Sequence, residues 1–245
     1  MANYNSGTLD PSNIPYSVNN YNVSPSDSTD IFKFQLSSIS DINISLDSIN
    51  GDADLILYRD NGNGYWDSND SQIASSYWGG AYDDSVNLAD QSAGTYFAKV
   101  YYYSSSTNNV NYNLDISTTR NYNASNLLPK EVIVGSIDSP DSITYRGSVG
   151  ASDTTDTYYF TVSSHWGTHI TLEGLSSDAD IRLIHDTNKN GIVDNGEVMR
   201  ASTNGGTVSE LLSYIPYTGG LFLQVYQHSG DTNYNLTFTG YANPS

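Results

Sequence analysis

Apolar residues recur along this chain with a spacing of two, which is the spacing of a β-strand that buries one face. The alternation is clear in residues 43–46 (NISL), 169–172 (HITL) and 221–226 (LFLQVY). Polar turns such as residues 228–231 (HSGD) separate these stretches. Residues 209–214 have a helix-like spacing, but the stretch is too short to form an element of its own. The pattern predicts an all-β protein.

The pattern also repeats, because four blocks of the first half return in the same order in the second half. The blocks are residues 30–34 (DIFKF) and 156–160 (DTYYF), 51–57 (GDADLIL) and 177–183 (SDADIRL), 93–101 (AGTYFAKVY) and 218–226 (TGGLFLQVY), and 111–114 and 233–236 (both NYNL). Four blocks in one order indicate an internal duplication.

The duplication divides the chain into module one, residues 1–118, and module two, residues 133–245. Residues 119–132 between them are polar, contain Pro129 and are predicted to be a linker. Each module is long enough to bury a core of its own. Several short strands at regular spacing in such a length predict two tandem antiparallel β-sandwiches of the jelly-roll type.

A calcium-binding loop is predicted directly after the second Asp-Ala-Asp strand, in residues 186–197 (DTNKNGIVDNGE). Oxygen-bearing side chains at positions 1, 3, 5, 9 and 12, with glycine at position 6, are typical of the EF-hand loop. The predicted ligands are Asp186, Asn188, Asn190, the carbonyl of Ile192, Asp194 and Glu197. Ca²⁺ takes 6–8 oxygens, and a tight turn at Gly191 would direct alternate side chains toward one point.

Such asparagine- and glycine-rich loops also occur as plain hairpin connections, and that reading stays open. The helices that usually flank an EF-hand loop are absent from the prediction, because a strand pattern precedes Asp186. Three acidic side chains around one point would repel each other without a cation, which favours the calcium reading.

Module one carries a shortened copy of this loop in residues 60–70 (DNGNGYWDSND), in which one residue has been lost between positions 1 and 6. The predicted ligands are Asp60, Asn61 or Asn63, the carbonyl of Tyr65, Asp67 and Asp70. Aspartate at the last position is one methylene shorter than glutamate and is expected to bind through one oxygen only. We therefore expect the site in module one to be the weaker of the two.

The pairs Asp52/Asp54 and Asp178/Asp180 sit two residues apart, so each pair shares one face of a strand. They are interpreted as turn-capping groups that face water, with a role as additional ion ligands as the alternative.

The charge and composition restrict the class of partner. Nine Lys+Arg against 27 Asp+Glu give a net charge of −18, which disfavours binding to nucleic acid or to anionic membranes. No apolar run approaches a membrane span of about 18 residues, and the start of the chain lacks the features of a signal peptide. The absence of cysteine excludes disulfides and thiolate metal sites.

No catalytic motif stands out in the sequence, and the protein is expected not to be an enzyme. All four histidines lie in module two, so a Ser-His-Asp triad common to both modules is impossible. His165 and His169 are four residues apart, but they fall in a turn and in an alternating strand, which disfavours a zinc site. Among the loop aromatics, Trp66 and Trp78 are candidates for a ligand-binding surface, with core packing as the alternative.

The repeated blocks resemble the bacterial pre-peptidase C-terminal domain, which is found in secreted proteases, collagenases and surface proteins. The resemblance rests on the Asp-aromatic strand, the Asp-Ala-Asp strand, the Gly-aromatic-Val-Tyr strand and the closing Asn-Tyr-Asn-Leu, and it covers both modules. It implies a non-catalytic jelly roll, often stabilised by calcium, that serves secretion, substrate attachment or adhesion. The calcium loops contain more oxygen ligands than the family requires, and no peptidase domain accompanies the two modules.

The sequence thus predicts an extracellular or cell-surface bacterial protein with Ca²⁺ as its only cofactor and a structural or adhesive role. The alternative is an accessory module that directs a separate secreted hydrolase to a polysaccharide or protein; an intracellular calcium sensor ranks last, because it needs helices. Self-association is expected through sheet edges or through residues 3–28, which are predicted to add a strand to a neighbouring subunit. The counterpart in module two, residues 132–155, is predicted to form a strand of its own sandwich.

Overall fold

The computed structural model describes residues 2–12, 14–47, 50–80, 82–104 and 109–243, and it confirms the all-β prediction. The chain divides into two compact units, residues 1–121 and 122–245. Within the described residues, no helix has the length and apolar character needed to span a bilayer.

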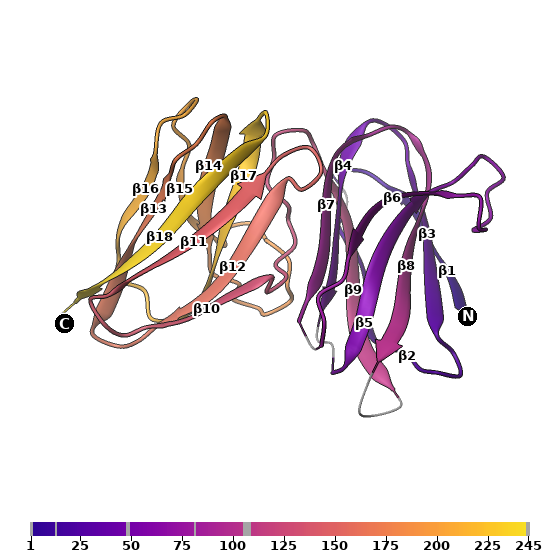
Figure 1. Cartoon of the computed structure of the whole chain (residues 1–245), viewed down its shortest axis with the longest axis horizontal. Helices are drawn as coiled ribbons and strands as arrows, with labels where there is room; N and C mark the ends of the chain where they lie inside the picture. Colours follow the sequence, from indigo (N-terminus) through magenta and orange to yellow (C-terminus); the bar gives the residue numbers. More distant parts are fainter. Residues whose placement is uncertain (1, 13, 48–49, 81, 105–108, 244–245) are drawn as a thin grey trace. The chain divides into compact units, whose positions relative to one another are not determined.

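Module one is a sandwich of a five-stranded and a four-stranded sheet (Figure 1). The five-stranded sheet has the order β1 (Ala2–Leu9), β3 (Thr29–Leu36), β8 (Gly94–Ser104), β5 (Asp52–Arg59), β6 (Ser71–Ser76). The four-stranded sheet has the order β2 (Tyr16–Val23), β9 (Val110–Thr119), β4 (Ser40–Asp47), β7 (Asp84–Gln91).

Module two repeats this topology with nine further strands. Its five-stranded sheet has the order β10 (Val132–Ile137), β12 (Thr155–Val162), β17 (Gly219–Ser229), β14 (Asp178–Ile184), β15 (Val198–Ser202). Its four-stranded sheet has the order β11 (Ser142–Val149), β18 (Thr232–Ala242), β13 (Trp166–Glu173), β16 (Glu210–Ile215). The helix-like stretch 209–214 therefore lies in strand β16, because its pairing with β13 and the burial of Leu212 in the core override the local spacing.

The registers of β3, β8 and β5 match those of β12, β17 and β14 residue by residue, which defines equivalent positions in the five-stranded sheets. Lys33 on β3 faces Phe97 on β8, and Tyr159 on β12 faces Phe222 on β17. Phe97 is also paired with Tyr58 on β5, as Phe222 is with Ile184 on β14.

The first strand of each module pairs in parallel with the third, which differs from the purely antiparallel sheets that were predicted. In module one, β1 pairs with β3 and β2 pairs with β9, so residues 3–28 lie within their own sandwich, except Asn13, which is outside the described residues. The counterpart in module two, β10 and β11, is arranged in the same way, as expected.

The core of each sandwich contains an aspartate–tyrosine hydrogen bond across the two sheets. The Tyr112 hydroxyl donates to Asp30 at 2.5 Å, and the Tyr234 hydroxyl donates to Asp156. Both aspartates come from the Asp-aromatic block, and both tyrosines come from the Asn-Tyr-Asn-Leu block. The repeated blocks therefore specify a shared core contact, and a buried carboxylate needs such a partner.

The Asp-Ala-Asp pairs do not face water as expected, since the side chains of Asp54 and Asp180 are both only 4% exposed. Burial raises the pKa of both carboxyls, that of Asp180 to about 6, and Tyr101 and Tyr226 supply hydrogen bonds to them. The second aspartate of each pair lies on the outer face of its sheet, since its neighbours Ala53 and Ala179 face the core. It is paired there with Tyr101 or Tyr226 of the adjacent strand.

Candidate metal centre

The two predicted calcium loops occupy equivalent places in the fold. Loop two, residues 186–197, joins β14 to β15, and loop one, residues 60–70, joins β5 to β6. In each case a buried strand ends at the first ligand position and an edge strand begins just after the last one. Gly191 and Gly64 have φ of +75° and +77°, which supplies the chain reversal that the sequence predicted at this position.

The side-chain oxygens of loop two accept hydrogen bonds from the backbone N–H groups of the same loop. The Asp186 carboxylate accepts hydrogen bonds from the N–H groups of Asn190 (3.2 Å) and Gly191 (3.0 Å). Asn188 Oδ1 accepts from the N–H of Asn190 at 3.1 Å, and Asn190 Oδ1 accepts from the N–H of Ile192 at 2.9 Å. These are Asx turns, in which a side-chain oxygen caps the backbone two residues on.

Glu197 closes the loop from its far end. Its Oε1 accepts from the N–H of Thr187 at 2.8 Å, and its Oε2 accepts from the N–H of Asp194 at 3.0 Å. The side chain is buried, which by itself raises the pKa. The backbone donors of Asp194 and Thr187 and the Thr187 hydroxyl outweigh burial, so the pKa lies below its ordinary value and the group is ionised. The role of Thr187 was not predicted, because it follows from a backbone donor and carries no ligand signature.

Asp194 lies within the same group of side chains. Its Oδ2 accepts from the amide nitrogens of Asn188 at 2.7 Å and Asn190 at 3.0 Å. The structure therefore brings Asp186, Asn188, Asn190, Asp194 and Glu197 into one hydrogen-bonded loop. Ile192, whose carbonyl was the sixth predicted ligand, follows the glycine and forms an isolated antiparallel bridge with Leu127.

Loop one repeats the same contacts despite its missing residue. The Asp60 carboxylate accepts from the N–H of Gly64 at 3.1 Å, and Asn61 and Asn63 each cap the residue two positions on. Asp70 closes the loop by accepting from the N–H groups of Asn61 (2.9 Å) and Asp67 (2.9 Å). Both asparagines thus have counterparts in loop two, Asn188 and Asn190, and the lost residue lies between Asp60 and Asn61.

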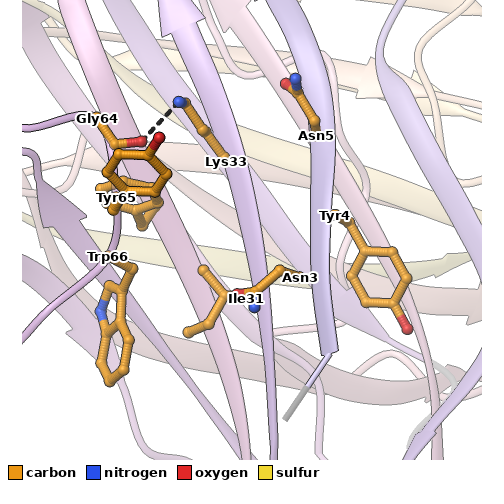
Figure 2. Close-up of a pocket in the computed structure, with 9 residues that line it drawn as sticks. Asn3, Tyr4, Asn5, Ile31, Lys33, Gly64, Tyr65 and Trp66 are labelled. Atoms are coloured by element: carbon orange, nitrogen blue, oxygen red, sulfur yellow. Dashed lines mark hydrogen bonds between the residues drawn. The ribbon is translucent and has the colours of Figure 1, made fainter.

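The glycine carbonyl of each loop has a different partner. Lys33 Nζ donates to the carbonyl of Gly64 at 2.7 Å, which places an ammonium group beside loop one (Figure 2). In loop two, the carbonyl of Gly191 accepts instead from the backbone N–H of Leu128 at 2.8 Å. A neutral amide thus replaces a positive charge next to the ligand oxygens.

The carboxylates of the loops are not yet arranged as a metal shell. Among the described residues, no three acidic or histidine side chains converge closely enough to hold a metal ion by themselves. Mutual repulsion keeps such groups apart. In loop two, Asp186 and Glu197 are held by backbone donors and Asp194 by side-chain amides. The residues fit Ca²⁺ in type, since they are carboxylates and side-chain amides on one short loop. Binding would require Glu197 and Asp194 to exchange some of these hydrogen bonds for ion contacts.

The two candidate tryptophans differ in exposure. Trp78 is 58% exposed, but Trp66 is half-buried, 6.2 Å from the ring of Tyr58 and 5.1 Å from Lys99 Nζ. The exposure of Trp78 fits a ligand-binding role better than the exposure of Trp66, and the role of both rings stays a prediction. His169 packs on the rings of Tyr214 and Tyr241, which supports its reading as a packing residue.

The family-model comparison concerns module one. A family model described as the bacterial pre-peptidase C-terminal domain matches residues 28–102, a stretch that includes loop one. The resemblance is therefore confirmed for this part of the chain. No curated protein matches the chain.

Solved structures show a more distant likeness. The pre-peptidase C-terminal domain of collagenase from Bacillus anthracis is 20% identical, covers 49% of this chain and 95% of its own, and has a TM-score of 0.34. PliG, a periplasmic inhibitor of g-type lysozyme from Aeromonas hydrophila, is 19% identical, covers 44% of this chain and 97% of its own, and has a TM-score of 0.29. At these TM-scores the likeness carries no inference about function.

Proposed function

We propose that this protein is a non-enzymatic, calcium-binding structural or adhesive component of the bacterial exterior. Each sandwich presents one calcium loop. The bound ion stiffens the connection from β5 to the edge strand β6 in module one and from β14 to the edge strand β15 in module two. The observation that carries the proposal is the closure of loop two by its first and last acids, Asp186 and Glu197. Calcium supplies the positive charge that neutralises the clustered oxygens.

The backbone geometry supports this proposal over a plain hairpin connection. A simple turn needs one or two capping side chains, whereas every predicted side-chain ligand in loop two takes part in the same hydrogen-bonded group. Extracellular calcium modules bind at about 10⁻⁴–10⁻³ M, and loop two is expected at this affinity or tighter.

Thermal unfolding with increasing free Ca²⁺ tests the proposal. An ion that binds only the folded state raises the melting temperature. The double variant Asp186→Ala, Glu197→Ala is expected to lose most of this rise, whereas the exposed Glu173→Ala should retain it. A full calcium response in the double variant would show that loop two is not the site.

The second candidate function is an accessory module that attaches a separate secreted hydrolase to a polysaccharide or protein. The match of residues 28–102 to the pre-peptidase C-terminal domain favours it. Cosedimentation with insoluble chitin, cellulose and collagen separates the two candidates. Retention that is abolished by Trp78→Ala would support attachment to a substrate, and absence of retention on all three would leave the structural role as the better account.

A further inference from the structure

The segment predicted as a linker is packed against module two. The carbonyl of Ser125 accepts from Arg182 Nη2 at 2.6 Å, and the carbonyl of Leu127 accepts from Gln224 Nε2 at 2.8 Å. Two backbone bonds join the segment to loop two, from Leu128 N–H to the Gly191 carbonyl and from Val193 N–H to the Asn126 carbonyl, both 2.8 Å. Residues 125–128 therefore run along the outer face of β12, β17 and β14, with a single isolated bridge at Leu127.

Leu128 is the apolar anchor of this segment. It is 4% exposed and belongs to a small cluster on the outside of the sheet. The other members of that cluster are Ile184, Phe222, Tyr159 and Val193. The cluster is separate from the main core between the two sheets of module two.

Module one has the equivalent surface, and none of its described residues forms such a segment over it. By strand register and loop position, the four residues around Leu128 correspond to Tyr58, Phe97, Lys33 and Trp66. The last three of these line a cavity of about 330 Å³, together with β1 and with Gly64 and Tyr65 of loop one (Figure 2). That volume lies at the lower end of the range for ligand sites, about 300–1,000 Å³.

The groups around this cavity match the needs of an extended peptide. Tyr65 is 78% exposed at the position of Ile192, the residue that bridges to Leu127 in module two. Lys99 takes the place of Gln224 and carries donors for a peptide carbonyl.

We infer that the outer face of β3, β8 and β5 in module one is a binding groove for an extended peptide of another protein, anchored by a leucine between Lys33, Phe97 and Trp66. The peptide lies as residues 125–129 lie on module two, with backbone bonds to loop one and its leucine in the cavity. A second copy of this chain is a poor donor, because its own segment is held in cis at a much higher effective concentration.

Titration of the ¹⁵N-labelled full chain with the acetylated and amidated peptide NASNLLPK, which copies residues 123–130, tests the inference. We expect the amide signals of Asn3, Asn5, Gly64 and Trp66, and the indole signal of Trp66, to shift in a saturable manner. A peptide with alanine in place of the second leucine should bind at least about tenfold more weakly, because it removes the side chain that fills the cavity.

A variant of the protein sharpens the test. Lys33→Tyr installs the residue found at the equivalent position of module two and frees the Gly64 carbonyl for the peptide N–H, so it should bind the peptide several-fold more tightly. Absence of shifts at about 2 mM peptide, or equal binding of the two peptides, would overturn the inference. So would shifts of the same signals by cellohexaose or chitohexaose alone, which would assign the cavity to a glycan.

Discussion

Loop one and loop two have the same hydrogen-bonded frame but different surroundings. In both, the first acid accepts from the glycine N–H and the last acid accepts from two backbone N–H groups. In loop one, the glycine carbonyl accepts a hydrogen bond from Lys33. In loop two, the backbone of residues 126–128 forms hydrogen bonds with Gly191 and Val193. The comparison shows that duplication has preserved the loop geometry and changed what stabilises it: a charged side chain in module one, and a docked segment in module two.

This difference has a consequence for ion binding. The ammonium group of Lys33 contacts the Gly64 carbonyl of loop one, and we expect it to repel a divalent cation bound there. Loop two has no such charge on its glycine, and it has glutamate in place of Asp70 as its last acid. Both differences favour tighter binding at loop two.

The largest expected effect is that of Leu128→Ala. Truncation of a buried leucine costs about 2–5 kcal/mol, and the loss of the anchor should also weaken calcium binding at loop two. Urea unfolding and calcium titration of the variant measure both effects. Leu211→Ala, which removes a side chain that is 53% exposed, is the matched control. Unchanged stability of Leu128→Ala would show that the segment is not firmly docked.

Calcium should protect the segment from proteolysis. An ion in loop two fixes Gly191 and Val193, which hold residues 126–128, so local opening becomes rarer. We expect trypsin to cleave after the exposed Lys130 about tenfold more slowly with saturating Ca²⁺ than with chelator. Cleavage after the exposed Arg120, which precedes the docked segment, serves as the internal reference. If chelation accelerates both cleavages equally, calcium binding at loop two does not stabilise the docked segment.

Removal of the charge beside loop one should strengthen its calcium binding. Lys33→Met is expected to raise the affinity of loop one by up to about tenfold at low ionic strength, and by less at high salt, because the lysine is partly exposed. Calorimetry in an Asp186→Ala, Glu197→Ala background isolates this loop. An affinity independent of both the substitution and the salt concentration would exclude the lysine as the cause.

The smallest effect concerns pH. Burial raises the pKa of Asp41, Asp84 and Asp115 to about 6 each, from an ordinary value of 3.8. Between these values the folded state holds more protons than the unfolded state, so stability is lost as the pH rises through about 6. With chelator present, the melting temperature should be a few degrees higher at pH 5 than at pH 7.5. Asp84→Asn should reduce this dependence, and the exposed Asp138→Asn should not.

The sequence predicted the fold class and the residues that form each loop, because both depend on local sequence patterns. Alternation in residues 43–46 specifies β4, and ligand spacing in residues 186–197 specifies the Asx turns that the structure contains. The sequence did not predict contacts between distant residues. Lys33 reaches Gly64 across 31 positions, and Leu128 packs against Phe222 through a cluster that no local pattern indicates.

Two further differences have the same physical origin. Local spacing made residues 209–214 look helix-like, yet β13 offers them a strand partner, and Glu210 is fully buried there. Turn preference placed Asp54 and Asp180 in water, yet each is buried on the outer face of its sheet beside a tyrosine of the neighbouring strand. Tertiary partners decide both cases, and they are not visible in a single stretch of sequence.

Isothermal titration of the calcium-free full chain with Ca²⁺ tests most directly whether the two loops are ion sites of unequal strength. We predict two binding events, of which the tighter disappears in Asp186→Ala, Glu197→Ala and the weaker in Asp60→Ala, Asp70→Ala. No binding heat in the wild-type protein, or two events that survive in both double variants, would contradict the account.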